Sequence, residues 1–170
     1  MEDVLKQAAE YERTYTIVSR AHYIASDQFA IRNRWLGIPV VIITTVIGTT
    51  IFGTLNENPD PKLRIAAGLM SLFGAVLAAL QTTFGYGQTA ERHKAAAARY
   101  RAIRRKLKTF RLKYSGAPPD KRGEAIGELE ALNEELEAIA AESPNIPDAC
   151  YDRAVRDYDS EQKRLGQASA

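Results

Sequence analysis

Few side chains in this sequence have the types and spacing that chemistry requires. The chain has two histidines, His22 and His93, and one cysteine, Cys150. His22 falls within an apolar heptad pattern, so we expect it to be buried and hydrogen-bonded to a neighbour rather than to act as a ligand. The GYG segment at 85–87 follows no predicted strand, and no P-loop, HExxH or CxxC motif is present. No catalytic, cofactor-binding or metal site is therefore predicted, and we do not expect an enzyme.

Threonine hydroxyls are the other side-chain groups that could have a functional role. Five threonines fall within the apolar run 35–55, and two of them, Thr45 and Thr49, are spaced by four residues. On a helix these two share one face, where they could line a narrow wet path between several copies of the chain. Alternatively, each hydroxyl bonds back to its own helix and only tightens packing. The sequence leaves both interpretations open.

The elements that carry these threonines are two long apolar runs, residues 35–55 and 63–84. The first contains no charged residue, and the second contains only Arg64. About 20 helical residues cross a hydrocarbon core of about 30 Å. Each run is apolar on every face, and a chain of 170 residues is too short to bury two such helices completely in a soluble core. With the short polar turn 56–62 between them, the runs predict a two-span transmembrane helical hairpin rather than a soluble core or a secretory signal.

Charge around the two spans predicts their orientation. Topology follows Lys and Arg close to the membrane ends. Such bases flank the same side of both spans: Arg32, Arg34, Arg92, Lys94 and Arg99. We expect these residues at the membrane surface, with His93 at the level of the headgroups and both termini in the cytoplasm. Residues 91–113 carry ten bases and one acid, and residues 114–170 carry six bases and thirteen acids. The acidic segment should therefore dock on the basic one, within one chain or between protomers, and we do not expect nucleic acid as a partner.

The polar segments outside the spans carry heptad patterns, in which apolar residues recur at alternating steps of three and four. They predict an N-terminal helix in 1–34, a basic helix in 85–114, and acidic helices in 115–170, at 122–142 and 148–165. Prolines separate the last helices. Together with the hairpin, this is an all-α membrane protein whose long cytoplasmic helices form a coiled-coil-like bundle. The four expected seams are Val4, Ala8, Tyr11, Tyr15, Val18, His22, Ala25 and Phe29; Ala96, Tyr100, Ile103, Leu107, Phe110 and Tyr114; Ala125, Leu129, Leu132, Leu136 and Ile139; and Tyr151, Val155, Tyr158, Gln162 and Leu165.

Small residues in the two spans indicate where helices could approach closely in lipid. In lipid, packing rather than hydrophobicity drives helix association, and small residues spaced by four favour it. We expect Gly53 in the first span to take part in such packing. The second span has a ladder of four small residues, hereafter the small-residue ladder: Ala67, Ser71, Ala75 and Ala79. Apart from Arg64 at the very start of the second span, no acid, base or histidine lies in either span. Because two spans also cannot enclose a path, any conduction would require a homo-oligomer.

Two segments carry a family resemblance. SRAHYIASDQFAIRNRWLG runs directly into the hairpin, and RHKAAAARYRAIRRKL opens the helix that follows it. Together with the hairpin and its flanking charge, they resemble the SLATT domain, a two-transmembrane effector associated with SMODS nucleotide synthases and SLOG sensors in bacterial conflict systems. The resemblance covers about residues 21–112, with an extension to about Ser160.

The resemblance implies a function that the residues alone do not give. It implies antiviral defence, in which a pore-forming effector permeabilises the membrane and causes abortive infection. No sensor, nuclease or synthase domain is expected beside the hairpin and bundle, so the trigger would be a separate nucleotide synthase or sensor, a small ligand of the bundle, or self-association. Two other interpretations remain open: a non-conducting membrane anchor that docks a cytoplasmic partner, and an auxiliary subunit of a larger membrane complex.

Overall fold

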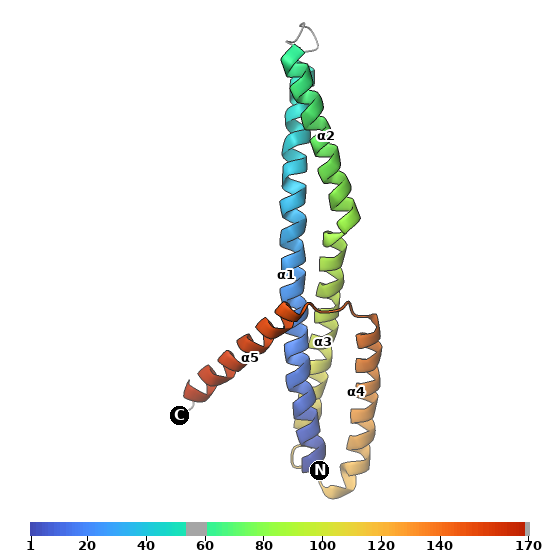
Figure 1. The fold of residues 1–170 in the computed structure, drawn as a ribbon. Coiled ribbons are helices and arrows are strands. Elements are labelled where there is room, and N and C mark those ends of the chain that lie inside the picture. The colour runs from blue at the N-terminus through green and yellow to red at the C-terminus, as the bar shows by residue number, and fades with distance from the viewer. Residues whose placement is uncertain (54–60, 169–170) are drawn as a thin grey trace. The chain divides into compact units, whose positions relative to one another are not determined.

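A computed structural model describes residues 1–53 and 61–168, with side chains in 1–49 and 61–168. Its helices are α1 (Glu2–Gly53), α2 (Pro61–Phe84), α3 (Tyr86–Tyr114), the short 3₁₀ helix η1 (Pro119–Lys121), α4 (Arg122–Glu142) and α5 (Asp148–Ala168), as Figure 1 shows. The described residues form no strand, which confirms the all-helical prediction. The chain divides into two compact units. The hairpin unit is Gln28–Thr89, and the bundle unit combines Met1–Asp27 with Ala90–Ala170.

The hairpin unit is built from the second half of α1 and from α2. The first predicted span is not a separate helix, because α1 continues unbroken from Glu2 to Gly53 with Pro39 inside it. The predicted turn 56–62 lies outside the described residues except for its last two positions, which open α2. A Cβ added to Gly74 would stand 3.1 Å from Ile43 Cγ2, and one added to Gly37 would stand 3.0 Å from Gln81 Nε2. Glycine therefore permits the close approach of α1 and α2 at two levels.

Gly85 separates α2 from α3. Its φ of 55° lies in the left-handed region, which a residue without a Cβ adopts at little cost. The N–H of Thr89 donates to the Gly85 carbonyl at 3.0 Å, so α3 begins immediately after the break. The rings of Phe84 and Tyr86 stack across it at 5.2 Å, and Tyr86 also stacks on Phe29 at 6.0 Å. The GYG segment is thus a helix junction.

The main core of the bundle unit lies between α1, α3 and α4. All six residues of the predicted α3 seam are buried, and so are all five of the α4 seam. On α1 the predicted seam is buried at Val4, Ala8, His22 and Ala25 and half-buried at its other positions. Ile17 and Ala21 are buried too, although they lie outside that seam. The reason is that α1 has a second packed face, which contacts α5.

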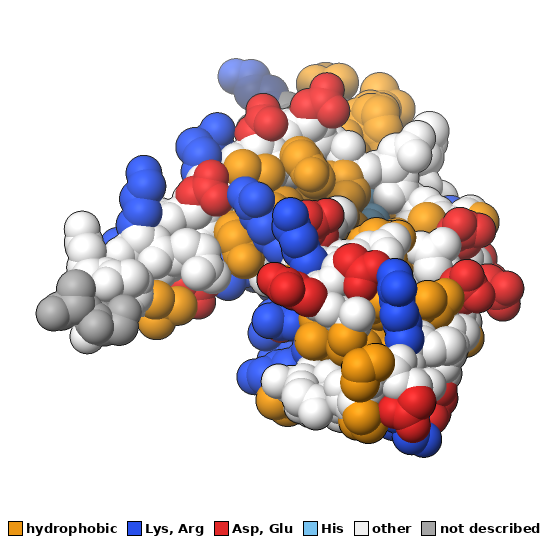
Figure 2. Space-filling view, turned by 90° about the horizontal axis from the view of Figure 1, so that it is seen from below, with side chains coloured by type: hydrophobic (Ala, Val, Ile, Leu, Met, Phe, Trp, Pro, Cys, Tyr) orange, Lys and Arg blue, Asp and Glu red, His pale blue; other side chains and the backbone are white. Residues whose placement is uncertain are grey.

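The predicted seam of α5 is right in part: Val155 and Tyr158 are half-buried, whereas Tyr151, Gln162 and Leu165 are exposed. The buried residues of α5 are Cys150 and Ala154, whereas Tyr151 is 40% exposed and Leu165 is 57% exposed. Ala154 packs with Ile17 and Ala21 of α1, with the half-buried Val155 and Tyr158 beside it. Figures 1 and 2 both show that α5 diverges from the other helices of the bundle unit toward its C-terminal end. Because only its first turns pack, small residues at the contact matter more than a long apolar stripe.

A ladder of ion pairs joins α3 to α4. Lys106 Nζ lies 2.6 Å from Glu135 Oε2, and Lys113 Nζ lies 2.5 Å from Glu128 Oε2. Arg99, seven residues before Lys106 on α3, pairs with Glu142, seven residues after Glu135 on α4. Each step of seven residues along α3 is matched by seven in the opposite direction along α4, as flanking charges in an antiparallel coiled coil require. The basic and acidic segments therefore dock within one chain, by the charge complementarity that the sequence predicts.

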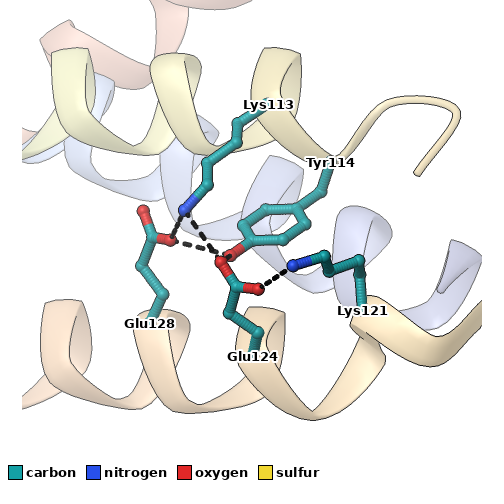
Figure 3. A network of polar contacts seen from close by, with 5 residues as sticks. All are labelled: Lys113, Tyr114, Lys121, Glu124 and Glu128. Atoms are coloured by element: carbon teal, nitrogen blue, oxygen red, sulfur yellow. Dashed lines mark hydrogen bonds and ion pairs between the residues drawn. The ribbon is translucent and has the colours of Figure 1, made fainter. Parts of the chain in front are cut away.

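The lower end of this ladder closes into the network that Figure 3 shows. The Tyr114 hydroxyl, on a buried side chain, donates to Glu128 Oε2 at 2.9 Å and lies 3.2 Å from Glu124 Oε1. Lys121 Nζ lies 2.8 Å from Glu124 Oε2 and, through this hydrogen bond, lowers the pKa of that carboxyl. These contacts fix the start of α4 against the end of α3.

Candidate functional site

The surface of the hairpin unit is apolar on side chains that nothing in the described chain covers. On α1, Val41 and Ile42 are 64% and 58% exposed; on α2, Leu69 and Leu72 are each 64% exposed. Two described helices are long and apolar enough to cross a membrane, and only 6% of the most apolar stretch of each is buried. A core helix of a soluble protein would be mostly buried. These helices therefore require an apolar surrounding.

Thr45 and Thr49 both lie exposed on α1, within the hairpin unit. The Thr45 hydroxyl donates to the Val41 carbonyl at 2.8 Å. The Thr49 hydroxyl lies 3.0 Å from the carbonyl oxygens of both Thr45 and Val46. Each hydroxyl proton is therefore satisfied by its own helix, as the packing interpretation expects, while the oxygen lone pairs remain able to accept. Whether these side chains face a pore stays a prediction.

The small-residue ladder of α2 faces outward rather than toward α1. Ser71, Ala75 and Ala79 are exposed, and Ala67 is half-buried. The contact with α1 is made instead by Gly74, whose partner Ile43 is also buried. Gly53 is the last residue of α1, and its surroundings lie outside the described residues. The ladder is therefore available to a second hairpin, and its use there stays a prediction.

Two buried histidines meet inside the bundle unit. His22 of α1 and His93 of α3 are each 1% exposed, and their Nδ1 atoms lie 2.9 Å apart. His22 is thus hydrogen-bonded to a neighbour, as its seam position predicts. The expectation that His93 lies among lipid headgroups is wrong. His93 precedes the seam residue Ala96 by three positions, so extending the heptad pattern one step upstream would have found it.

Aromatic rings continue this pair along the interface between α1 and α3. Tyr100 stacks on His22 at 5.5 Å and on Tyr15 at 5.7 Å. Burial lowers the pKa of His22 to about 4, and the nearby His93 contributes to that shift. Burial also lowers the pKa of His93. At neutral pH both rings are therefore neutral, so one Nδ1–H can donate to the other Nδ1.

Comparison with protein families assigns this architecture. The family model of the SMODS and SLOG-associating 2TM effector domain, family 4, matches residues 5–164. The chain belongs to this family. The match includes both the hairpin unit and nearly all of the bundle unit, so the two helices described above are the two transmembrane segments of the family. Comparison with curated proteins and with solved structures finds no match.

As a SMODS and SLOG-associating effector domain, the chain is a membrane protein linked to conflict systems. The bases expected at the membrane surface can be placed within their own units. In the hairpin unit Arg32 and Arg34 are exposed, and the Arg32 guanidinium lies over the Phe29 ring at 5.5 Å. In the bundle unit Arg92 and Lys94 are exposed. Arg99 has a partner in Glu142, which makes it part of the α3–α4 ladder. A role for these bases in binding lipid stays a prediction.

The described residues offer few other side chains that could bind a metal ion or react. Among residues 1–53 and 61–168, no group of three or more His, Cys, Asp or Glu side chains is placed to hold a metal ion. Cys150 is buried near the start of α5. The arrangement therefore consists of an apolar hairpin and a tightly paired helical bundle.

Proposed function

We propose that this chain is a defence effector that oligomerises in the bacterial inner membrane and permeabilises it, which stops the infected cell in abortive infection. The family description, an effector associated with SMODS and SLOG domains, supports a role downstream of a separate nucleotide synthase or sensor. The observation that carries the proposal is the outward face of the hairpin unit. It combines large apolar side chains with an exposed ladder of small residues, and nothing in the described chain covers either.

Oligomerisation follows from the small number of spans. Two helices in contact leave no room for a path between them, and Gly74 and Ile43 close the space in this hairpin. Several hairpins could pack through the ladder at Ser71, Ala75 and Ala79, because small residues let helix backbones approach in lipid. Thr45 and Thr49 would then supply the polar atoms of the lumen, with the oxygens left as acceptors.

The orientation proposed has both termini in the cytoplasm. The bases on the termini side of the spans, such as Arg32, Arg34 and Arg92, outnumber those of the opposite turn, where only Lys62 and Arg64 occur. Exposed side chains at Arg32, Arg34 and Arg92 are compatible with anionic headgroups. A cysteine-accessibility scan of residues added at either end would measure this orientation directly.

Membrane potential and dye uptake after induced expression, together with leakage from reconstituted vesicles, test permeabilisation. Ala75→Leu fills the ladder and should reduce both cross-linked oligomers and leakage. Ala66→Leu is the matched control: it makes the same change on an exposed position of α2, nine residues away and hence on the opposite side of the helix. Thr49→Leu should leave oligomers intact and reduce leakage. Equal leakage from Ala75→Leu and the unchanged chain, at equal membrane insertion, contradicts the proposal.

A membrane anchor for a cytoplasmic partner is the second candidate, and the outer face of α3 favours it. Arg101, Arg105 and Lys108 are exposed and have no ion pair among the described residues, and Leu112 beside them is 71% exposed. An acidic partner could bind this face. Replacing both spans with unrelated ones separates the candidates, because an anchor keeps its activity after the exchange and a pore loses it.

A further inference from the structure

Four arginines line one groove of the bundle unit. The groove lies between α1, α3 and α5 and has a volume of about 380 Å³. Arg13 and Arg20 come from α1, and Arg104 and Arg111 come from α3. Small-molecule sites occupy about 300–1,000 Å³, so a compact ligand fits this volume. No sequence motif joins these residues, because they come from helices far apart in the chain.

Acidic side chains neutralise only part of this charge. Arg111 Nη1 lies 2.7 Å from Glu12 Oε2, and Arg20 is paired with Glu161 of α5. Arg13 has only a longer contact, at 3.7 Å, to Asp159. Four guanidinium groups and two carboxylates line the groove, and Asp159 beside it approaches Arg13, so at least one positive charge remains in excess.

Arg104 is the centre of this excess. Its side chain is half-buried, and it makes no ion pair among the residues that the structure describes. The neighbouring bases of α3 differ from it: Lys106 is paired with Glu135, and Arg105 is exposed on the surface. A partly desolvated guanidinium without a carboxylate favours a bound anion, and its planar set of donors matches phosphate oxygens.

The aromatic side chain of the groove further defines the ligand. The guanidiniums of Arg13 and Arg20 both lie over the Tyr158 ring, each at 5.8 Å from its centroid. This ring therefore positions two cations at the groove and is already engaged by them, so phosphate groups rather than a stacked base are the chemistry that the site recognises.

We propose that the groove binds a small soluble anion that carries two or more phosphate groups. Arg104 and Arg13 receive it first, and it then competes with Glu161 for Arg20. Binding of the anion would thus break the ion pair between Arg20 and Glu161, which holds α5 against α1. The proposal does not depend on whether the hairpin conducts, because binding is measured on a chain that need not permeabilise anything.

Titration calorimetry of the full chain in nanodiscs of phosphatidylcholine, with inorganic tripolyphosphate as the probe, tests the site. We expect saturable binding that is tighter than that of orthophosphate. Arg104→Gln should weaken it at least about tenfold, as the loss of a charge-assisted contact predicts. Arg105→Gln, which removes the same charge from an exposed neighbour, should leave it unchanged. Glu161→Gln should tighten binding several-fold, because it removes the competing carboxylate.

Three outcomes would overturn the proposal. The first is no saturable binding by the unchanged chain. The second is an equal loss in Arg104→Gln and Arg105→Gln, which would mean diffuse attraction by the basic surface. The third is an effect of Arg104→Gln that is confined to nanodiscs containing phosphatidylglycerol, which would assign the arginines to lipid headgroups. Circular dichroism checks that Arg104→Gln folds, and the tightening expected of Glu161→Gln tests the site through a second, independent residue.

Discussion

Protonation of the buried histidine pair should weaken the bundle unit. The folded chain holds His22 with a pKa of about 4, whereas an unfolded histidine has a pKa of about 6.5. Between these values the unfolded state binds more protons, so stability is complete above about pH 6.5 and falls as the pH falls toward 4. The lowered pKa of His93 acts in the same direction.

The expected size of this effect follows from the two pKa values of His22. Lowering the pH from 7.5 to 5.0 should reduce the free energy of unfolding by about 2 kcal/mol through this residue alone. Because His22 is only 1% exposed, solvent does not screen the free-energy cost of protonating it in the folded chain. The loss should level off below about pH 4, where the folded state also becomes protonated.

Urea unfolding of the full chain in detergent micelles, followed by circular dichroism at the two pH values, measures this effect. His22→Gln removes one titrating ring and keeps a polar side chain beside His93. Acidic groups that also respond to pH are common to both proteins, so the difference between them isolates the histidine. The variant should lose about 2 kcal/mol of the pH dependence. If its free energy of unfolding changes with pH as much as that of the unchanged chain, the reasoning from burial is refuted.

Two further predictions concern the α3–α4 ladder and the junction at Gly85. Lys106→Glu should lower the free energy of unfolding by about 0.5–1 kcal/mol in the same urea assay, and Glu135→Lys in the same chain should restore it, since the pair is exposed. Failure of the second change to restore stability would contradict a direct pair. Gly85→Ala should cost about 1–2 kcal/mol because φ is 55° there, seen as faster hydrogen exchange at the Thr89 amide. Gly68→Ala, in open space on α2, is the control and should leave that exchange unchanged.

The bundle could be predicted from sequence wherever a helix packs on one side only. The α3 and α4 seams follow unbroken heptads, and each predicted residue is buried. The prediction for α5 holds at Val155 and Tyr158, which pack beside Ala154. It failed at Tyr151 because an aromatic residue suggested the packed face, whereas the fully buried residues of α5 are the small Cys150 and Ala154. It failed for His93 because neighbouring bases obscured a position that the α3 seam reaches one step upstream.

The sites that depend on pairing between distant segments could not be predicted. The contact of Gly74 with Ile43 depends on the register between α1 and α2, which no local pattern fixes. The arginine groove has the same origin. Arg13 and Arg104 come together because α1, α3 and α5 meet there, and the sequence shows each only as one base among many.

Because Cys150 is buried, the reactivity of its thiol can report how often α5 opens. It is the only cysteine, its side chain is fully buried, and it lies on α5 one turn before Ala154, which packs on α1. A thiol reagent can reach the sulfur only when α5 has lifted, so the labelling rate is the intrinsic thiol rate multiplied by the fraction of time α5 spends detached. Mass spectrometry of the alkylated chain would therefore time the opening of this helix in intact cells, without an introduced cysteine.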